Sequence, residues 1–267
     1  ESGFSISMSK DGNRVAIGAP ENVGNGTSSG HVRIYENIGG NWSQLGQDLD
    51  GVGYEHDFGY SVSLSDDGNT IAIGDIQTAN GNNNSGYVSI YNWSGASWNQ
   101  IGQDIDGEVV GDQSGHSVSL SNDGNTVAIG APGHNNGNGG GSGHVRIYNW
   151  SGSFWNQLGL DIDGEEAGDG SGHSVSLSDD GNTVAIGAQS NNGNGTNSGH
   201  VRIYKYDGIN WNQLGSDIDG EAAGDASGHA ISLSSDGNTV AITAWQNSDN
   251  GYVSGHVRIY NYNGTSW

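Results

Sequence analysis

Cysteine is absent from this chain of 267 residues, and lysine and arginine together number only 7. Without cysteine the chain can form neither a disulfide framework nor a thiolate metal site, so cysteine usage gives no information on its compartment. The 30 aspartates and glutamates leave a net charge of −23. Because like charges repel, we expect no binding to nucleic acid or to anionic membranes, whereas solubility and cation binding are favoured.

Long apolar runs are missing as well. The sequence has no stretch of about eighteen apolar residues and no leader with a basic and then an apolar region, so we expect neither direct membrane insertion nor a secretion signal within it. Proline occurs only 2 times, and glycine occurs 49 times without the Gly-X-Y period of collagen. Since Trp, Tyr and branched aliphatic residues recur at regular places, the composition predicts a turn-rich β protein and not a disordered chain.

The sequence is an internal repeat with a period of 56 or 57 residues. A glycine that opens the first predicted strand of each copy stands at Gly3, Gly59, Gly115, Gly172 and Gly228. A tryptophan follows the same spacing at Trp42, Trp98, Trp155, Trp211 and Trp267. We therefore predict a single domain of residues 1–267 with repeats 3–58, 59–114, 115–171, 172–227 and 228–267.

Each copy has the pattern of four short strands. In the third copy these are residues 117–121, 127–130, 145–148 and 155–158, and Asp123-Gly124 between the first two indicates a tight hairpin. No segment has helical periodicity. Four antiparallel strands per repeat predict an all-β fold, a β-propeller of five blades, in preference to a β-solenoid, whose rungs are usually shorter. The fifth blade is predicted to lack its outer strand.

Two short motifs carry a family resemblance. Phe58-Gly59-Tyr60-Ser61-Val62, and Gly130-Ala131-Pro132 at the end of a second strand, resemble the FG-GAP repeats of integrin α-subunit propellers and of secreted bacterial surface proteins. The resemblance implies an extracellular β-propeller that serves adhesion, or protein and glycan binding, without catalysis. In that family calcium often lies in a long loop between the first and second strands. Here that loop is as short as SNDGNT, so the family's calcium site does not carry over.

From these features we expect a secreted or cell-surface module that is not an enzyme and that binds a protein or glycan at the cell surface. A structural subunit of an extracellular assembly or filament is one alternative, because the third strand of the last copy, residues 257–260, would leave an open edge for self-association unless the native chain continues. A glycoside hydrolase-like propeller enzyme is the other. Catalysis needs an asymmetric set of groups, and the repeats are broken only at Glu55-His56-Asp57 and Ala244-Trp245-Gln246.

The acidic loop that joins successive copies is the candidate metal site. Its carboxylates follow part of the ligand spacing of a calcium-binding EF-hand loop, without the glycine at position six or the glutamate at position twelve. The candidate residues are Asp104, Asp106, Glu108, Asp112, Asp161, Asp163, Glu165, Asp169, Asp217, Asp219, Glu221 and Asp225. The alternative is no cofactor, with these carboxylates accepting backbone N–H groups or pairing with the third-strand arginines Arg33, Arg146, Arg202 and Arg258.

Histidine and tryptophan positions are interpreted as packing sites. Phe4 and Tyr60 replace the first-strand histidine in two copies, and Tyr87 replaces the third-strand histidine in one, so an aromatic ring suffices there. The fourth-strand tryptophans are expected to pack the outer strand onto its sheet. The copies differ freely only in the loop between the second and third strands, which makes it the candidate ligand-binding region. It contains Asn25, Asn83, Asn135, Asn194 and Asn247.

Overall fold

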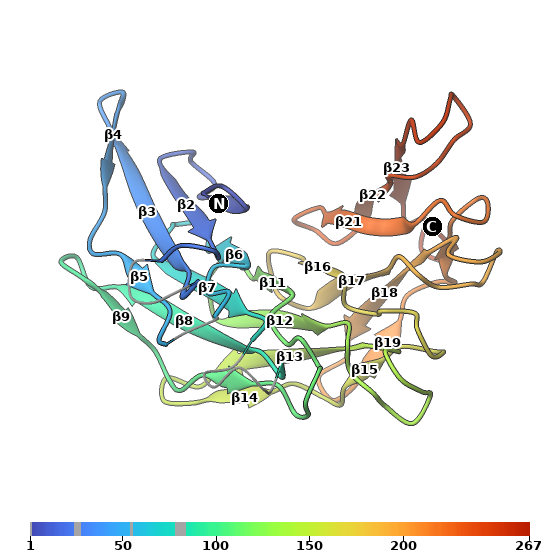
Figure 1. The fold of residues 1–267 in the computed structure, drawn as a ribbon, viewed down its shortest axis with the longest axis horizontal. Coiled ribbons are helices and arrows are strands. Elements are labelled where there is room, and N and C mark those ends of the chain that lie inside the picture. The colour runs from blue at the N-terminus through green and yellow to red at the C-terminus, as the bar shows by residue number, and fades with distance from the viewer. Residues whose placement is uncertain (1, 24–27, 54–55, 78–83) are drawn as a thin grey trace. The chain divides into compact units, whose positions relative to one another are not determined.

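The computed structural model describes residues 2–23, 28–53, 56–77 and 84–267 (Figure 1). Every regular element among these residues is a β-strand. No helix in the described part is long and apolar enough to cross a membrane. The strands form four five-stranded sheets and one three-stranded sheet, which confirms the all-β prediction and the shorter fifth sheet.

The sheets follow the repeats along the chain. The first contains β1 (Ser5–Met8), β2 (Arg14–Ala19), β3 (His31–Ile38), β4 (Asn41–Gln44) and β5 (Leu49–Asp50). The second contains β6 (Ser61–Leu64), β7 (Thr70–Asp75), β8 (Tyr87–Trp93), β9 (Trp98–Gln100) and β10 (Ile105–Asp106). The third contains β11 (Ser117–Leu120), β12 (Thr126–Ala131), β13 (His144–Trp150), β14 (Trp155–Gln157) and β15 (Ile162–Asp163). The fourth contains β16 (Ser174–Leu177), β17 (Thr183–Ala188), β18 (His200–Tyr206), β19 (Trp211–Gln213) and β20 (Ile218–Asp219), and the fifth β21 (Ser227–Leu233), β22 (Thr239–Ala244) and β23 (His256–Asn261).

The four predicted strands lie side by side in sequence order, and a fifth strand of two residues pairs with the third. In the fourth sheet this short strand, β20, pairs antiparallel with the start of β18. The sequence analysis missed it, because an Ile-Asp pair is too short to show a period of two. This short strand matters for the site, because it holds the acidic loop beside the third strand.

The hairpin between the first two strands shows why the Asp-Gly sequence recurs in every repeat. In the first copy the Ser9 hydroxyl donates to the Asp11 carboxylate at 2.7 Å, and the Asn13 backbone N–H donates to the same carboxylate at 2.9 Å. Gly12 between them has a φ of 70°, which a side chain would disfavour. These bonds hold the pKa of Asp11 at about 2, and the Ser9 hydroxyl is the largest contributor.

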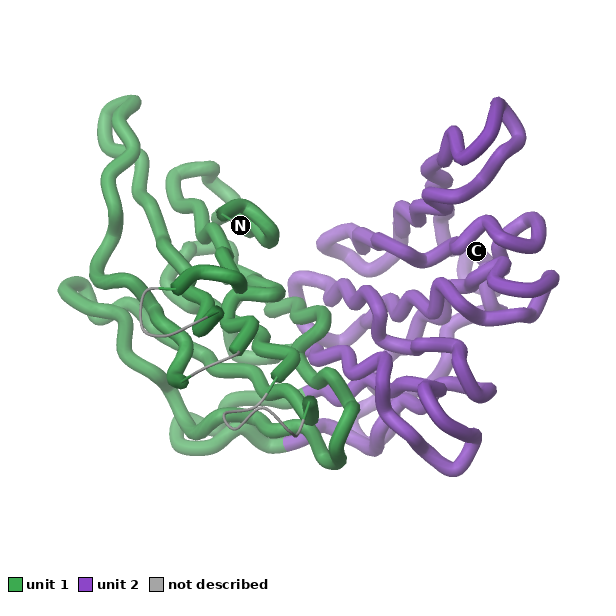
Figure 2. Tube along the Cα trace, in the orientation of Figure 1, with its two compact units in different colours: residues 1–127, 148–156 green, residues 128–147, 157–267 purple. Residues whose placement is uncertain are grey.

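The chain divides into two compact units, and the division runs through the third sheet (Figure 2). Unit 1 comprises residues 1–127 and 148–156, and its core contains Ile71, Ile73 and Trp98. Unit 2 comprises residues 128–147 and 157–267, and buried aliphatic side chains of β13, β17 and β18 form its core. One domain of five repeats stays a prediction.

Successive repeats approach each other closely within a unit. A Cβ on Gly18 would lie 2.2 Å from the carbonyl oxygen of Gly59, so only glycine fits there. The Ser5 hydroxyl donates to that same oxygen at 2.7 Å. In unit 2 the equivalent contact joins Gly187 and Ser174 to the carbonyl oxygen of Gly228. The repeated glycines and serines of the first two strands are therefore inter-repeat contacts.

The fourth-strand tryptophans pack between repeats as well as onto their own sheet. The Trp98 indole is 3% exposed and donates to the Leu45 carbonyl of the preceding repeat at 2.9 Å. In unit 2 the Trp211 indole donates to the Leu158 carbonyl at 2.8 Å. Trp42 differs, since 46% of its surface is exposed. These tryptophans join one repeat to the previous one, which the prediction of packing within a sheet did not include.

Candidate functional site

The short fifth strand brings carboxylates to the start of the third strand. In the fourth sheet His200 lies opposite Asp219, and Val201 lies opposite Ile218. Asp217 directly precedes this pair, so it lies near the imidazole of His200. Glu165 comes from the acidic loop of the preceding repeat. The site thus takes its groups from two consecutive loops and one strand.

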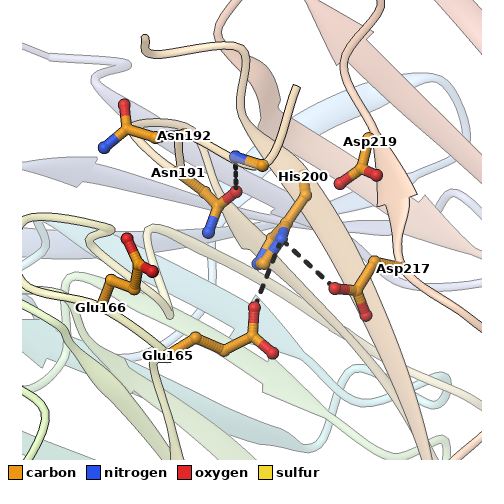
Figure 3. A pocket seen from close by; sticks show the side chains of 8 residues that line it. Glu165, Glu166, Asn191, Asn192, His200, Asp217 and Asp219 are labelled. Carbon is orange, nitrogen blue, oxygen red and sulfur yellow. Dashed lines mark hydrogen bonds and ion pairs between the residues drawn. The ribbon is translucent and has the colours of Figure 1, made fainter. Parts of the chain in front are cut away.

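Figure 3 shows His200 between the carboxylates of Glu165 and Asp217. The His200 Nδ1 atom is 3.8 Å from an Asp217 oxygen and 4.0 Å from a Glu165 oxygen. One ligand atom from each of the three residues lies within 4.8 Å of the others. They line a cavity of about 550 Å³ together with Glu166, Asn191, Asn192, Gly193 and Asp219.

The electrostatics of this cavity favour a cation. Burial lowers the pKa of His200, which is 2% exposed, and the nearby Arg202 lowers it further. The imidazole therefore offers a neutral nitrogen at neutral pH. Arg202 donates to the Asp163 carbonyl at 2.6 Å and lies 3.5 Å from a Glu165 oxygen. One arginine faces several carboxylates, so a divalent cation would balance their charge.

The last aspartate of each predicted metal loop has a structural role. Asp112 is fully buried and accepts the Glu108 and Val109 backbone N–H groups at 2.8 and 2.9 Å. Asp169 accepts the Glu166 N–H at 3.0 Å, and Asp225 accepts the Ala222 N–H at 3.1 Å. These contacts match the backbone-bonding alternative. The carboxylates of one loop are thus not gathered as in an EF-hand loop.

The other candidate acids have a variety of partners. Asp104 accepts the Ser89 hydroxyl at 2.5 Å, and Asp161 lies 3.7 Å from His144. Asp106 and Asp163 lie on short fifth strands, opposite Tyr87 and His144.

Within single units, two further groups combine a third-strand histidine with two carboxylates. They are His31 with Asp48 and Asp50, and His256 with Glu221 and Asp249. In the second group Arg258 forms an ion pair with Glu221. Interpreting the third-strand histidines as packing residues missed this environment. The signal that could have found it is the acidic pair placed 17 and 19 residues after His31 and His200, at Asp48, Asp50, Asp217 and Asp219.

First-strand histidines do contact aromatic rings, as the sequence suggested. The ring centroids of Tyr60 and His116 are 5.1 Å apart, and those of Phe4 and Tyr60 are 5.0 Å apart.

The described loop asparagines make structural hydrogen bonds, either within their own loop or to the neighbouring acidic loop. Asn135 accepts the Gly141 N–H at 2.7 Å, and Asn194 donates to the Gly220 carbonyl at 2.9 Å. Asn247 is 1% exposed and donates to Asp225 at 3.1 Å. Asn25 and Asn83, which we also proposed as ligand-binding positions, lie outside the described residues.

The irregular segment of the first acidic loop makes a buried hydrogen-bond contact with the end of β7. His56 Nδ1 lies 2.9 Å from the Asp75 carboxylate, and these side chains are 1% and 0% exposed. Burial raises the pKa of the neighbouring Asp57, which accepts a bond from Gln77 at 2.7 Å. Glu55 lies outside the described residues. Of the two carboxylates that we considered for a glycosidase, Glu55 and Asp57, only Asp57 is therefore described.

Comparisons with known proteins bear on the fold. The sequence matches no protein-family model and no curated protein. Hydrazine synthase of Kuenenia stuttgartiensis aligns with a TM-score of 0.60 at 14% identity, over 97% of this chain and 71% of that one. A structure solved under the name of a 6-phosphogluconolactonase from Bacteroides uniformis gives 0.59 at 15% identity, over 98% and 72%. The periplasmic gluconolactonase of Pseudomonas aeruginosa gives 0.59 at 19% identity, over 98% and 73%.

The chain has a β-propeller fold. The neighbours that share it support the propeller but not FG-GAP repeats in particular. They also contradict two predictions, because two of them bear the names of lactonases and the third that of a synthase. A non-catalytic adhesion module, and a chain that is not an enzyme, are therefore wrong inferences from the family resemblance. At these identities the likeness shows the fold, so the chemistry must be argued from the residues of this chain.

Proposed function

We propose that this propeller is a hydrolase that opens the ester bond of an uncharged sugar lactone, with a divalent cation held by Glu165, His200 and Asp217. The observation that carries the proposal is the acidic cavity of about 550 Å³ in which these three groups converge. The names of the two lactonase neighbours support the reaction class. A mixed set of imidazole and carboxylates suits Mn²⁺ or Zn²⁺ better than Ca²⁺, which prefers oxygen ligands throughout.

The cation would polarise the lactone carbonyl and lower the pKa of a bound water. In hydrolysis the water oxygen adds to the carbonyl carbon and the ring carbon–oxygen bond breaks. Asp219 lines the same cavity, and its carboxylate would accept the proton of the water and return it to the ring oxygen that leaves. The products are a hydroxyl group and a carboxylic acid, which releases the second proton of the water to solvent at neutral pH.

The charge of the site selects among lactones. Glu165, Glu166, Asp217 and Asp219 line the cavity, and Arg202 is the basic side chain that contacts this set among the described residues. A phosphorylated lactone would bring its own negative charge to these carboxylates. We therefore expect an uncharged lactone to be preferred. A secreted or periplasmic location is part of this proposal, and the name of the Pseudomonas neighbour, which calls that protein periplasmic, supports it.

The test is hydrolysis of δ-gluconolactone and of 6-phosphogluconolactone, followed by titration of the acid produced. The chain is first treated with a chelator and then supplied with Mn²⁺, Zn²⁺ or Ca²⁺. We expect cation-dependent hydrolysis of the uncharged lactone, and a loss of at least about 100-fold in His200→Gln and Asp217→Asn.

His31→Gln, in the equivalent cluster of unit 1, is the matched control and should keep full activity. The proposal fails if neither lactone is hydrolysed faster than in buffer with any of the three cations. It fails equally if His200→Gln and His31→Gln behave alike.

A further inference from the structure

One corner of the fifth sheet departs from every other repeat at two positions. Where the earlier repeats place Gly187 and Ser174, the fifth places Thr243 and Ala230. A Cβ on Gly187 would lie 2.2 Å from the Gly228 carbonyl oxygen, so the glycine is needed for docking of the next repeat. Thr243 instead accepts the Ala230 N–H at 2.8 Å and donates to the Ala230 carbonyl at 3.1 Å. The threonine thus fixes the first strand of its own sheet.

The first strand is reshaped at the same corner. β21 spans seven residues, against four in β16, and its pairing with β22 shifts register between Ser227 and Ile231. Such bulges redirect side chains and occur often beside functional sites. His229 lies within the shifted segment and is exposed.

An exposed tryptophan lies against this histidine. Trp245 follows β22, at a position where three other repeats have Pro20, Ile76 and Pro132, and 46% of its surface is exposed. Its ring centroid is 5.3 Å from that of His229 at an interplanar angle of 43°. His229 in turn lies 5.1 Å from His173 at 36°. Three rings from two repeats therefore form one aromatic surface in unit 2.

A glutamine fixes the protonation of the two imidazoles. Gln189 contacts His173 Nδ1 at 3.2 Å through its amide nitrogen and His229 Nδ1 at 2.8 Å through its amide oxygen. One Nδ1 must therefore accept a hydrogen and the other must donate one, and exchanging the two ends of the amide only exchanges these roles. The two Nε2 atoms consequently have opposite roles, one donor and one acceptor. Burial lowers the pKa of His229, which keeps its ring neutral.

We propose that this surface, His173, Gln189, His229 and Trp245, binds the ring of an uncharged pyranose sugar. The apolar C–H face of a pyranose stacks on an indole, and its neighbouring hydroxyls match a donor beside an acceptor. The four residues include no lysine or arginine, and the net charge of −23 disfavours anionic sugars. The inference goes beyond the proposed function, because sugar binding is measured without turnover and does not depend on the cation.

The experiment is isothermal titration of the whole chain, in the presence of chelator, with cellobiose, maltose, lactose and chitobiose. We expect at least one disaccharide to bind, and Trp245→Ala to weaken that binding about tenfold or more. Gln189→Glu should also weaken it, because a carboxylate can only accept and both Nδ1 atoms must then donate. Trp42→Ala is the matched control, since Trp42 has the same 46% exposure and lies in unit 1.

The inference is overturned if none of the four disaccharides binds, or if Trp245→Ala and Trp42→Ala bind the sugar equally well. Titration with adenosine distinguishes specific sugar binding from a general preference of the surface for flat rings. Binding of adenosine without any disaccharide would also contradict the proposal. Lactone hydrolysis by the unaltered chain is measured separately, so the proposals of sugar binding and of lactone hydrolysis can fail independently.

Discussion

The first and fourth repeats carry the same histidine and aspartates on the same strands, but their arginines have different partners. In the first repeat Arg33 donates to both oxygens of Asp48, at 3.0 Å from Nε and 2.8 Å from Nη2. In the fourth, Arg202 donates to the Asp163 carbonyl and lies 3.5 Å from a Glu165 oxygen. A glutamine donates to the aspartate in both repeats, from Gln44 to Asp48 at 2.6 Å and from Gln213 to Asp217 at 2.5 Å. In the first cluster the arginine thus pairs with the aspartate beside the histidine, whereas in the fourth it pairs with Glu165 of the preceding loop and Asp217 lines the cavity.

The histidines themselves do not make this difference. Burial and the nearby arginine lower the pKa of His31 as they lower that of His200. Both imidazoles are buried, at 6% and 2% exposure. The contrast therefore shows that a repeated sequence element acquires different contacts when one neighbouring side chain changes its partner.

The largest expected difference between these repeats is in packing. Trp211→Ala removes an indole that packs on the core of unit 2 and donates to the Leu158 carbonyl. We expect it to lower the free energy of unfolding by about 2–4 kcal/mol. Trp42→Ala removes a side chain that is 46% exposed and should cost less than about 1 kcal/mol. Urea unfolding followed by circular dichroism measures both, and equal losses would contradict the assignment of Trp211 as an inter-repeat contact.

A smaller effect on stability, together with a gain of cation binding, is expected when the ion pair between Arg33 and Asp48 in the first repeat is removed. Arg33 and Asp48 are 42% and 28% exposed, so Arg33→Ser should cost less than about 1 kcal/mol. Serine is the natural residue at this position of the second repeat, Ser89. Without the guanidinium, Asp48 joins His31 and Asp50 as a cation ligand. Titration with Mn²⁺ should show one additional site, and unchanged stoichiometry would mean that the arginine does not control cation binding.

The strands were predictable from the sequence because each one is determined by a local sequence pattern. A period of two and the Asp-Gly turn located the four strands of the third copy within one or two residues, and the 56-residue spacing located their counterparts in the other copies. The site was not predictable in the same way. Glu165, His200 and Asp217 are separated by 35 and 17 residues and belong to two repeats, and only the register that pairs His200 with Asp219 brings them together.

The prediction of no catalysis failed for a related reason. It assumed that equivalent carboxylates have equivalent surroundings. The partner of an arginine depends on side-chain geometry, and neither spacing nor composition indicates which carboxylate or carbonyl group Arg202 contacts.

The smallest expected effect is on the pH dependence of stability, and it comes from the Asp-Gly hairpins, which are alike in the first and fourth repeats. Hydrogen bonds from Ser9 and Asn13 lower the pKa of Asp11 from its ordinary 3.8 to about 2. Burial alone would raise the pKa of Asp180, but bonds from Ser178 and Asn182 outweigh it and leave the pKa lowered. A lowered pKa in the folded state means that these turns stabilise the fold above the ordinary value and lose that contribution as the pH falls through the folded value.

We therefore expect stability to fall between about pH 4 and pH 2 in the unaltered chain. Asp11→Asn and Asp180→Asn should each make this fall shallower by a similar amount, because asparagine keeps an accepting oxygen but does not titrate there. Melting temperatures measured at half-unit steps of pH test this. Since the turns lie away from the two histidine clusters, cation binding at pH 7 should be the same in both variants. A change in one variant alone would show that its turn is coupled to the cluster of that repeat, and the two repeats would then differ in more than the position of an arginine.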